Sequence, residues 1–201
     1  DLGMHPYADT FISKDQLRKT EPVYPLQCFL DPKTGHVKVG YQTNSDERYN
    51  LYDYSYTSSN SEFSKKYWES YAVEVCKKLK LNKPINILEI GSNDGYLSHQ
   101  FQKKGHNVLG VDSSNYMSKI ANELGVETYC GMFDFSLSQT LKEQYGKKDL
   151  IIANNVFNHA NDPLSFAHGA KNLLSKEGIF VFEVPYWYNT IVDKKFDQIY
   201  P

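Results

Sequence analysis

The sequence predicts an α/β protein with a mostly parallel, twisted sheet, helices on both faces, and a small β-rich amino-terminal appendage. Five short apolar runs from position 85 onward alternate with helical segments of about 10 to 15 residues, as in right-handed βαβ units. Before position 50 the chain instead has turn formers and short β-like runs such as 37–41. We therefore predict an appendage over 1–50 and an α/β domain over 51–201.

The first helix of the predicted α/β domain has the clearest periodicity. Ser59 and Glu62 have the spacing of a capping box, which predicts that the helix starts there. Apolar residues from Phe63 to Leu79 then recur at steps of three and four and form one stripe. The apolar run 85–90 that follows ends at a glycine, which suits a buried parallel strand.

The remaining elements alternate in the same way. Four apolar runs predict further strands, at 108–112, 126–130, 150–153 and 179–183. The predicted helices lie at about 96–103, after Ser113 or Ser114, at about 137–145, and after Asp162 with Pro163 as the first residue. Sheets of this kind bind ligands at the carboxyl ends of their strands, so the residues there are the candidates for a site.

Composition and charge narrow the class of ligand. The 201 residues carry a formal net charge of -2, so no broad basic surface favours nucleic acid or an anionic membrane. No apolar run approaches the roughly 20 residues that cross a bilayer, and the first residues are not typical of a signal peptide. The three cysteines are far apart, which predicts neither disulfides nor a zinc site. We expect a cytoplasmic protein that acts on a small molecule.

The turn after the first strand of the sheet predicts a cofactor pocket. Gly91 and Gly95 let the backbone approach a ligand closely, and Asn93 lies between them among the predicted contacts. Glu89 and Asp94 flank the turn, so they would repel a pyrophosphate and attract the sulfonium and amino groups of S-adenosylmethionine. The turn also lacks the G-x-G-x-x-G pattern of a dinucleotide site. S-adenosylmethionine is therefore favoured over NAD.

Polar residues at three further strand ends extend this pocket. Asp112 follows about 20 residues later, where a carboxylate can accept both ribose hydroxyls; capping of the next helix is the alternative. Phe133 and Asp134 offer a ring and a polar edge for adenine, although core packing explains the ring equally well. Asn154 and Asn155 bring amides to the same rim. All five are predicted cofactor contacts.

Five strings in the chain point to one family: LEIGSNDGYL, VLGVDSS, ANNVFNHANDP, GIFVFEVPYW and FDQIYP. In this order they resemble the S-adenosylmethionine-dependent C-methyltransferases that act on nucleotide-linked deoxysugars. The resemblance covers nearly the whole chain and implies a Rossmann-like class I methyltransferase fold. It also implies S-adenosyl-L-methionine as the cofactor and a nucleotide sugar as the partner. Upstream, YPLQCFLDPKTGHVKVGY is similar to that family's zinc-binding module, and YDYSYTSSNS to the segment before its catalytic domain.

The sequence departs from the family's pattern at both ends. Asp31 and Thr34 stand where the module usually has cysteines, and its other cysteine pair would lie upstream of Asp1, so we expect no zinc. The family continues after FDQIY with an acidic residue, a histidine and a carboxyl-terminal domain, whereas the sequence stops at Pro201. These departures predict a fragment, or a natural short form that lacks the usual base.

The resemblance implies provisional catalytic roles. C-methylation of a keto-sugar needs a base, an enolate stabiliser and an in-line methyl donor. His159 would bind or polarise a substrate oxygen, with a structural turn as the alternative; Tyr200 would donate a hydrogen bond to the enolate, and Tyr56 would line the substrate pocket. Three other functions stay open: an O- or N-methyltransferase of another small metabolite, a non-catalytic S-adenosylmethionine-binding domain, and an NAD-dependent sugar dehydratase or reductase, which the acidic turn disfavours.

Overall fold

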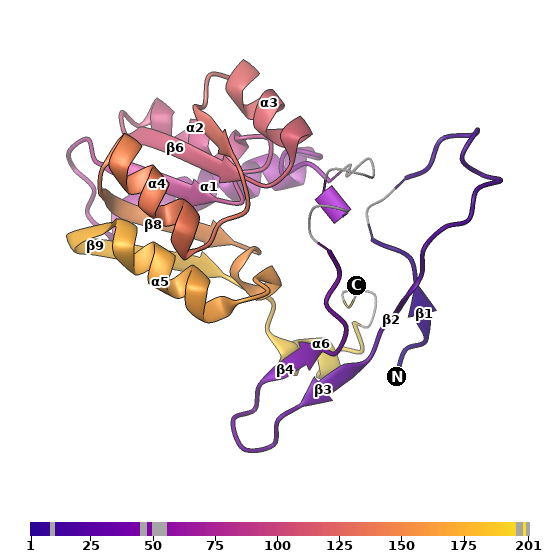
Figure 1. Cartoon of the computed structure of the whole chain (residues 1–201). Helices are drawn as coiled ribbons and strands as arrows, with labels where there is room; N and C mark the ends of the chain where they lie inside the picture. Colours follow the sequence, from indigo (N-terminus) through magenta and orange to yellow (C-terminus); the bar gives the residue numbers. More distant parts are fainter. Residues whose placement is uncertain (9–10, 45–47, 50–55, 196–198, 200–201) are drawn as a thin grey trace. The chain divides into compact units, whose positions relative to one another are not determined.

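The computed structural model describes residues 1–8, 11–44, 48–49, 56–195 and 199. The chain forms two compact units, one of residues 56–184 and one in which residues 1–55 group with 185–201. Figure 1 traces the chain through both units by colour. The grouping of 185–201 with the amino-terminal residues differs from the predicted division into 1–50 and 51–201.

The larger unit is built on a five-stranded sheet with the order β7-β6-β5-β8-β9, in which every described neighbouring pair is parallel. Its strands are β5 (Asn86–Ile90), β6 (Asn107–Asp112), β7 (Thr128–Cys130), β8 (Lys148–Asn154) and β9 (Leu174–Glu183). The chain order reverses between β5 and β8. The carboxyl ends of these two strands therefore border the place where such sheets bind ligands.

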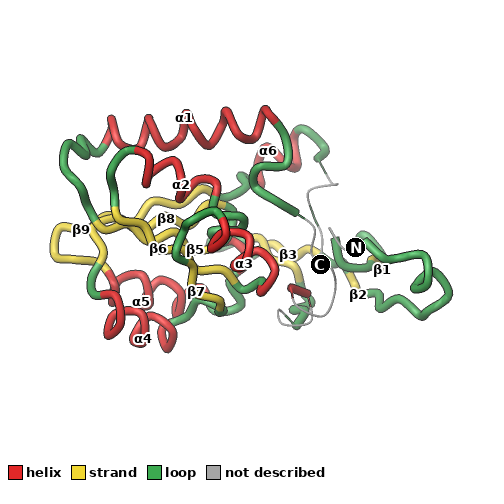
Figure 2. The backbone as a smooth tube through the Cα atoms, turned by 90° about the horizontal axis from the view of Figure 1, so that it is seen from above, coloured by secondary structure: helices red, strands yellow, loops and turns green. Residues whose placement is uncertain are grey.

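Helices cover both faces of this sheet (Figure 2). They are α1 (Glu62–Lys78), α2 (Tyr96–Lys103), α3 (Asn115–Glu123), α4 (Phe135–Tyr145) and α5 (Pro163–Leu173), with a 3-10 turn η2 (Phe157–His159) after β8. In Figure 2, α1 and α2 lie on one face and α4 and α5 on the other. No described helix has the length and apolar character needed to cross a membrane.

Alternate residues of the central strands fill two separate cores. Ile87 and Ile152 cluster with residues of α1 and α2, whereas Leu88 and Ile151 cluster with residues of α4 and α5. All four side chains are at most 1% exposed. A parallel sheet buried on both faces needs apolar residues at successive positions, which is why its strands appear in the sequence as continuous apolar runs.

The start of α1 differs from the prediction. Its N-cap is Ser61, whose side chain accepts a hydrogen bond from the Ser64 N–H at 3.1 Å. Ser59 instead donates through its hydroxyl to Asp94, with 2.6 Å between the two oxygens. The capping box of Ser59 and Glu62 was therefore wrong, because Ser59 is engaged by Asp94, which is distant in the sequence, and Ser61 caps the helix in its place.

Strand β9 also differs from its predicted range of 179–183, because it begins at Leu174. Its pairing with β8 is interrupted by a register shift between Lys148 and Leu150. Residues 175–178 are polar or glycine, so the part of the strand before Ile179 carried no continuous apolar signal. Where the register shifts, the regular ladder of hydrogen bonds between the two strands is locally disrupted.

Among the residues that the structure describes, the smaller unit includes two short antiparallel pairs and the helix α6 (Trp187–Val192). Strand β1 (Met4–His5) pairs with β2 (Tyr24–Pro25), and β3 (Cys28–Leu30) pairs with β4 (Val37–Val39). Asp31 and Thr34 lie in the β3–β4 turn, where the Thr34 hydroxyl donates to Asp31 Oδ2 at 2.8 Å. Among the described residues, no group of three or more His, Cys, Asp or Glu side chains is placed to hold a metal ion.

Candidate cofactor site

The turn between β5 and α2 has a backbone shape that only glycine accommodates without strain. Gly91 has φ +70°, and a Cβ there would lie 2.1 Å from Cγ2 of Val156. The Gly91 N–H donates to the Val111 carbonyl at 2.7 Å, which fixes the turn against the end of β6. Gly95 has φ +77° at the N-cap of α2, and a Cβ there would lie 2.9 Å from that of Ala121. The turn is thus packed closely on both sides.

Gly91→Ala is expected to lower the free energy of unfolding by about 2–4 kcal/mol, since the added methyl group meets Val156 and the backbone stays left-handed. Gly105→Ala is the matched control, because Gly105 has φ +87° and nothing within 4 Å of an added Cβ. Urea denaturation of both variants measures the difference. Equal losses in the two variants would show that the close approach of Val156 contributes nothing.

Asp112 lies at the carboxyl end of β6 and is 9% exposed. Its Oδ2 accepts a hydrogen bond from the Asn93 N–H, and its Oδ1 one from the Ser114 N–H, both at 2.8 Å. Burial raises the pKa of this carboxyl above its usual value. Each carboxylate oxygen can accept more than one hydrogen bond, so Asp112 can hold the turn and still accept ligand hydroxyls.

Glu89 is a second buried carboxylate beside the turn, 7% exposed near the end of β5. Its Oε2 accepts a hydrogen bond from the Ser98 hydroxyl at 2.5 Å. Burial raises the pKa of Glu89 to about 8, and the charges of Asp94 and Asp112 act in the same direction. A positive ligand beside these groups would be stabilised by all three, and an anionic one would be repelled.

Asn93 and Asp94 use their side chains to hold a distant segment onto the turn. Asn93 Oδ1 accepts from the Ser58 N–H at 2.8 Å, and its Nδ2 donates to the Tyr56 carbonyl at 3.1 Å. Asp94 Oδ2 accepts from both the N–H and the hydroxyl of Ser59, and Asp94 is 4% exposed. A direct contact of either side chain with the cofactor stays a prediction.

Phe133 and Asp134 have structural partners in the described residues. The Phe133 ring is 7% exposed and packs edge-on against Phe166, with 4.9 Å between ring centroids. Asp134 is the N-cap of α4, and its Oδ1 accepts from the Leu137 N–H at 2.7 Å. Core packing and helix capping account for both residues, and their contact with adenine stays a prediction.

Polar side chains gather where β8 and β9 end. The Tyr71 hydroxyl donates to Asn154 Oδ1 at 3.0 Å, and the Tyr67 hydroxyl donates to the carboxylate of Glu183. Asn155 donates to Glu183 Oε1 through its side chain at 3.3 Å. The sequence pointed to the two asparagines but not to the tyrosines or Glu183. The available signal was that Glu183 ends an apolar strand, as Asp112 does.

The three residues predicted to contact the substrate lie in different surroundings. His159 is exposed in the turn η2, where its N–H donates to the Val156 carbonyl at 2.9 Å. Tyr56 is 42% exposed and is held through its carbonyl by Asn93. Tyr200 lies outside the described residues. Their roles toward a substrate stay predictions.

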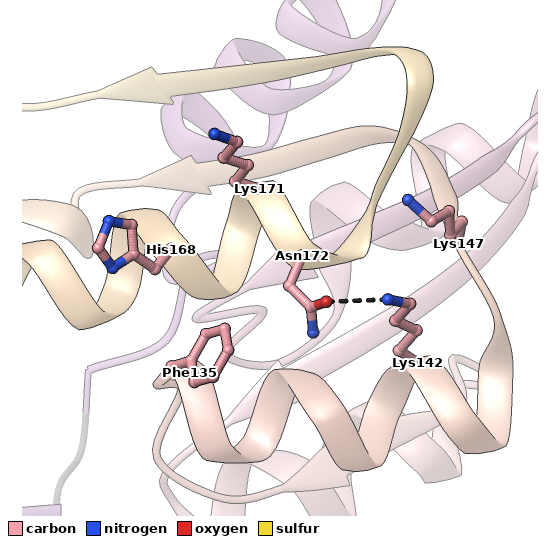
Figure 3. A pocket seen from close by; sticks show the side chains of 6 residues that line it. All are labelled: Phe135, Lys142, Lys147, His168, Lys171 and Asn172. Carbon is pink, nitrogen blue, oxygen red and sulfur yellow. Dashed lines mark hydrogen bonds between the residues drawn. The ribbon is translucent and has the colours of Figure 1, made fainter.

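A separate groove of about 350 Å³ lies between α4 and α5 (Figure 3). Its lining residues are Phe135, Lys142, Lys147, His168, Lys171 and Asn172. Lys142 Nζ donates to Asn172 Oδ1 at 3.0 Å. Three lysines disfavour a sulfonium cation, and none of the predicted cofactor contacts lines this groove. The acidic turn at β5 and β6 therefore remains the candidate cofactor site.

Comparison with known proteins identifies the family. The methyltransferase domain family matches residues 65–200, which is more than half of the chain. The C-methyltransferase NovU of Streptomyces niveus is 24% identical over 99% of this chain and 47% of its own length. A ubiquinone biosynthesis O-methyltransferase of Hydrogenovibrio crunogenus is 30% identical over 55% of this chain and 46% of its own length. The chain spans about half the length of these curated relatives.

Two solved structures share the fold. The plantazolicin methyltransferase BpumL, in complex with a pentazolic desmethylPZN analog and SAH, has a TM-score of 0.54 at 17% identity, covering 71% of this chain and 54% of its own. The PH0226 protein of Pyrococcus horikoshii OT3 has a TM-score of 0.54 at 23% identity, covering 70% of this chain and 62% of its own. The predicted Rossmann-like α/β fold is confirmed, and the chain belongs to the methyltransferase domain family.

Proposed function

We propose that this protein transfers a methyl group from S-adenosylmethionine to a carbon atom of a nucleotide-linked keto-deoxysugar. The observation that carries the cofactor assignment is the pair of buried carboxylates, Glu89 and Asp112, at neighbouring strand ends beside a closely packed glycine turn. The donor set suits a cation with a ribose, because carboxylates attract the sulfonium and amino groups and accept hydroxyl hydrogens. The family match of residues 65–200 supports the same assignment.

Each residue of the proposed site would have a distinct role. The cofactor supplies an electrophilic methyl group on sulfur. Asp112 would accept the ribose hydroxyls, and Glu89 would stabilise the positive end of the molecule. Asn93 and Asp94 would act through the Tyr56–Ser59 segment, which they hold at the turn. His159, Tyr56 and Tyr200 keep their predicted roles toward the acceptor.

The choice of a carbon acceptor is supported by the C-methyltransferase relative, whose match extends over 99% of the chain. The O-methyltransferase relative supports the alternative of an oxygen acceptor, over 55% of the chain. The two outcomes differ in the product, because C-methylation creates a carbon–carbon bond and O-methylation creates a methyl ether. Carbon-13 NMR of the product made from methyl-labelled cofactor separates them.

Calorimetric titration followed by a transfer assay tests the proposal. The full-length protein is titrated with S-adenosylmethionine, S-adenosylhomocysteine and NAD, and then incubated with labelled S-adenosylmethionine and a panel of dTDP-4-keto sugars. We expect binding of the first two, no binding of NAD, and a labelled sugar as product. Binding without transfer to any acceptor would support a non-catalytic cofactor-binding domain, and tight NAD binding would overturn the cofactor assignment.

A further inference from the structure

We propose that Glu183 binds the methyl acceptor, accepting a hydrogen bond from an acceptor hydroxyl while Tyr67 and Asn155 hold its carboxylate in place. This inference rests on the proposed function and deepens it. It names the chemical group that the acceptor presents to the ends of β8 and β9. Neither the glycine turn nor the cofactor carboxylates take part in it.

The carboxylate of Glu183 is held from two sides. Tyr67 of α1 donates to Oε2, and the Asn155 amide donates to Oε1 at 3.3 Å. The backbone reinforces this placement, because the Asn155 N–H donates to the Glu183 carbonyl at 2.6 Å. Each carboxylate oxygen has capacity for a further hydrogen bond. A fixed carboxylate with remaining acceptor capacity is suited to bind a hydroxyl group.

Glu183 lies at a suitable distance from the cofactor turn. It is paired in register with Asn154, at the end of β8, and β8 lies beside β5 in the sheet. Since neighbouring strands are about 4.8 Å apart, Glu183 is about 10 Å across the sheet from the end of β5. This separation leaves room for an acceptor beside the reactive methyl group.

Tyr71 and Asn154 lie beside Glu183 at the ends of β8 and β9. Burial raises the pKa of the Tyr71 hydroxyl, and the negative charges of Glu183 and Glu89 act in the same direction. Tyr71 donates to Asn154 Oδ1, while the buried Asn154 Nδ2 has no hydrogen-bond partner among the described residues. A buried amide donor without a partner is costly unless a ligand satisfies it.

The chemistry of the cluster selects hydroxyl groups over phosphates. Burial and the bond to Glu183 raise the pKa of Tyr67, so this tyrosine stays protonated and continues to donate at neutral pH. The carboxylate of Glu183 offers acceptors and negative charge, which a hydroxyl complements and a phosphate does not. We therefore expect the sugar ring of a nucleotide-linked acceptor, and not its diphosphate, to lie at the ends of β8 and β9.

The structure contains a matched control pair. Tyr96 donates to Glu69 Oε1 at 2.8 Å, between α2 and α1, so it repeats the tyrosine–glutamate bond away from the ends of β8 and β9. Glu69→Gln and Tyr96→Phe therefore remove the same kinds of group as Glu183→Gln and Tyr67→Phe. A difference in effect between the Glu183 and Tyr67 variants and the Glu69 and Tyr96 variants therefore reflects the position of the tyrosine–glutamate pair and not the kind of group removed.

The experiment measures sugar binding to the full-length protein saturated with S-adenosylhomocysteine. The probes are dTDP-4-keto-6-deoxyglucose and its analogues that lack one ring hydroxyl. Glu183→Gln is expected to raise the Kd of the parent sugar at least about 10-fold, Tyr67→Phe to raise it less, and the control variants to leave it unchanged. One deoxy analogue should bind the wild type weakly and show no further loss in Glu183→Gln, as expected for two groups in direct contact.

The possible outcomes distinguish a failure of the proposed function from a failure of the acceptor inference. A wild type that fails to bind S-adenosylmethionine overturns the proposed function itself. A wild type that binds the cofactor but no sugar overturns the acceptor inference alone. The same conclusion follows if Glu183→Gln weakens the binding of the parent sugar and of every deoxy analogue by the same factor relative to the wild type. If Glu183→Gln does not fold, Tyr67→Phe decides, because an unchanged Kd in that variant would show that the held carboxylate does not bind the sugar.

Discussion

Asp112→Ala is expected to weaken S-adenosylmethionine binding by about 100-fold or more, because hydrogen bonds from two ribose hydroxyls to a charged acceptor are lost together. The substitution also removes the acceptor of the Asn93 and Ser114 N–H groups, so the turn itself loses support. Calorimetric titration at a temperature where both proteins are folded measures the loss of affinity.

Asp149→Ala controls for the removal of a carboxylate that binds backbone. Asp149 Oδ2 accepts from the Asn86 N–H at 3.0 Å, where β5 begins, and so lies at the opposite end of the strand from the cofactor turn. We expect this variant to bind the cofactor with wild-type affinity. Undiminished affinity in Asp112→Ala would remove the basis for placing the ribose at the end of β6.

S-adenosylmethionine affinity is expected to rise between about pH 6 and pH 9, with Glu89 as the titrating group. Burial holds the pKa of Glu89 at about 8 in the free protein, so this side chain is mostly neutral at pH 7. A bound cation favours the ionised form of Glu89, so binding at neutral pH releases a proton from this side chain. At higher pH the side chain is already ionised, and binding no longer requires that proton to be lost. Titration in buffers of different ionisation enthalpy measures the proton release directly.

Glu89→Gln provides the control for this pH dependence. Glutamine retains an oxygen for the Ser98 hydroxyl but cannot ionise, so the variant should bind more weakly above pH 8 and show a flat profile. S-adenosylhomocysteine should show a shallower slope than S-adenosylmethionine, because it lacks the sulfonium charge. A wild-type affinity that is constant from pH 6 to pH 9 would contradict the role of Glu89 as a charge-responsive contact.

The same pKa shift has a consequence for stability. The pKa of Glu89 in the folded protein lies above its value of about 4.5 in an unfolded chain, so the folded state binds the proton more tightly. The resulting stabilisation is complete below pH 4.5 and is lost as the pH rises toward 8. Thermal denaturation should accordingly show that the stability of Glu89→Gln relative to the wild type increases between these two pH values.

The succession of elements in the larger unit followed from local pattern. Continuous apolar runs mark strands buried on both faces, and the predicted helix at 96–103 corresponds to α2 in the structure. The sequence also predicted an N-cap at Ser113 or Ser114, which is Ser114 in the structure, and the start of α5 after Asp162, because side-chain caps act over a few residues. The glycines and acidic residues of the β5–α2 turn pointed to the candidate site for the same reason.

Tertiary structure alone decided which polar groups of the site face which partners. The side chains of Asn93 and Asp94 form hydrogen bonds with backbone or hydroxyl groups 35 or more residues earlier in the chain. Tyr67 donates a hydrogen bond to Glu183, which lies 116 residues later. Such pairs depend on strand order and register, which bring distant residues together only after the sheet has formed. Sequence thus determined the sheet and the acidic turn through short-range periodicity, whereas the hydrogen-bond partners within the site were set by long-range packing.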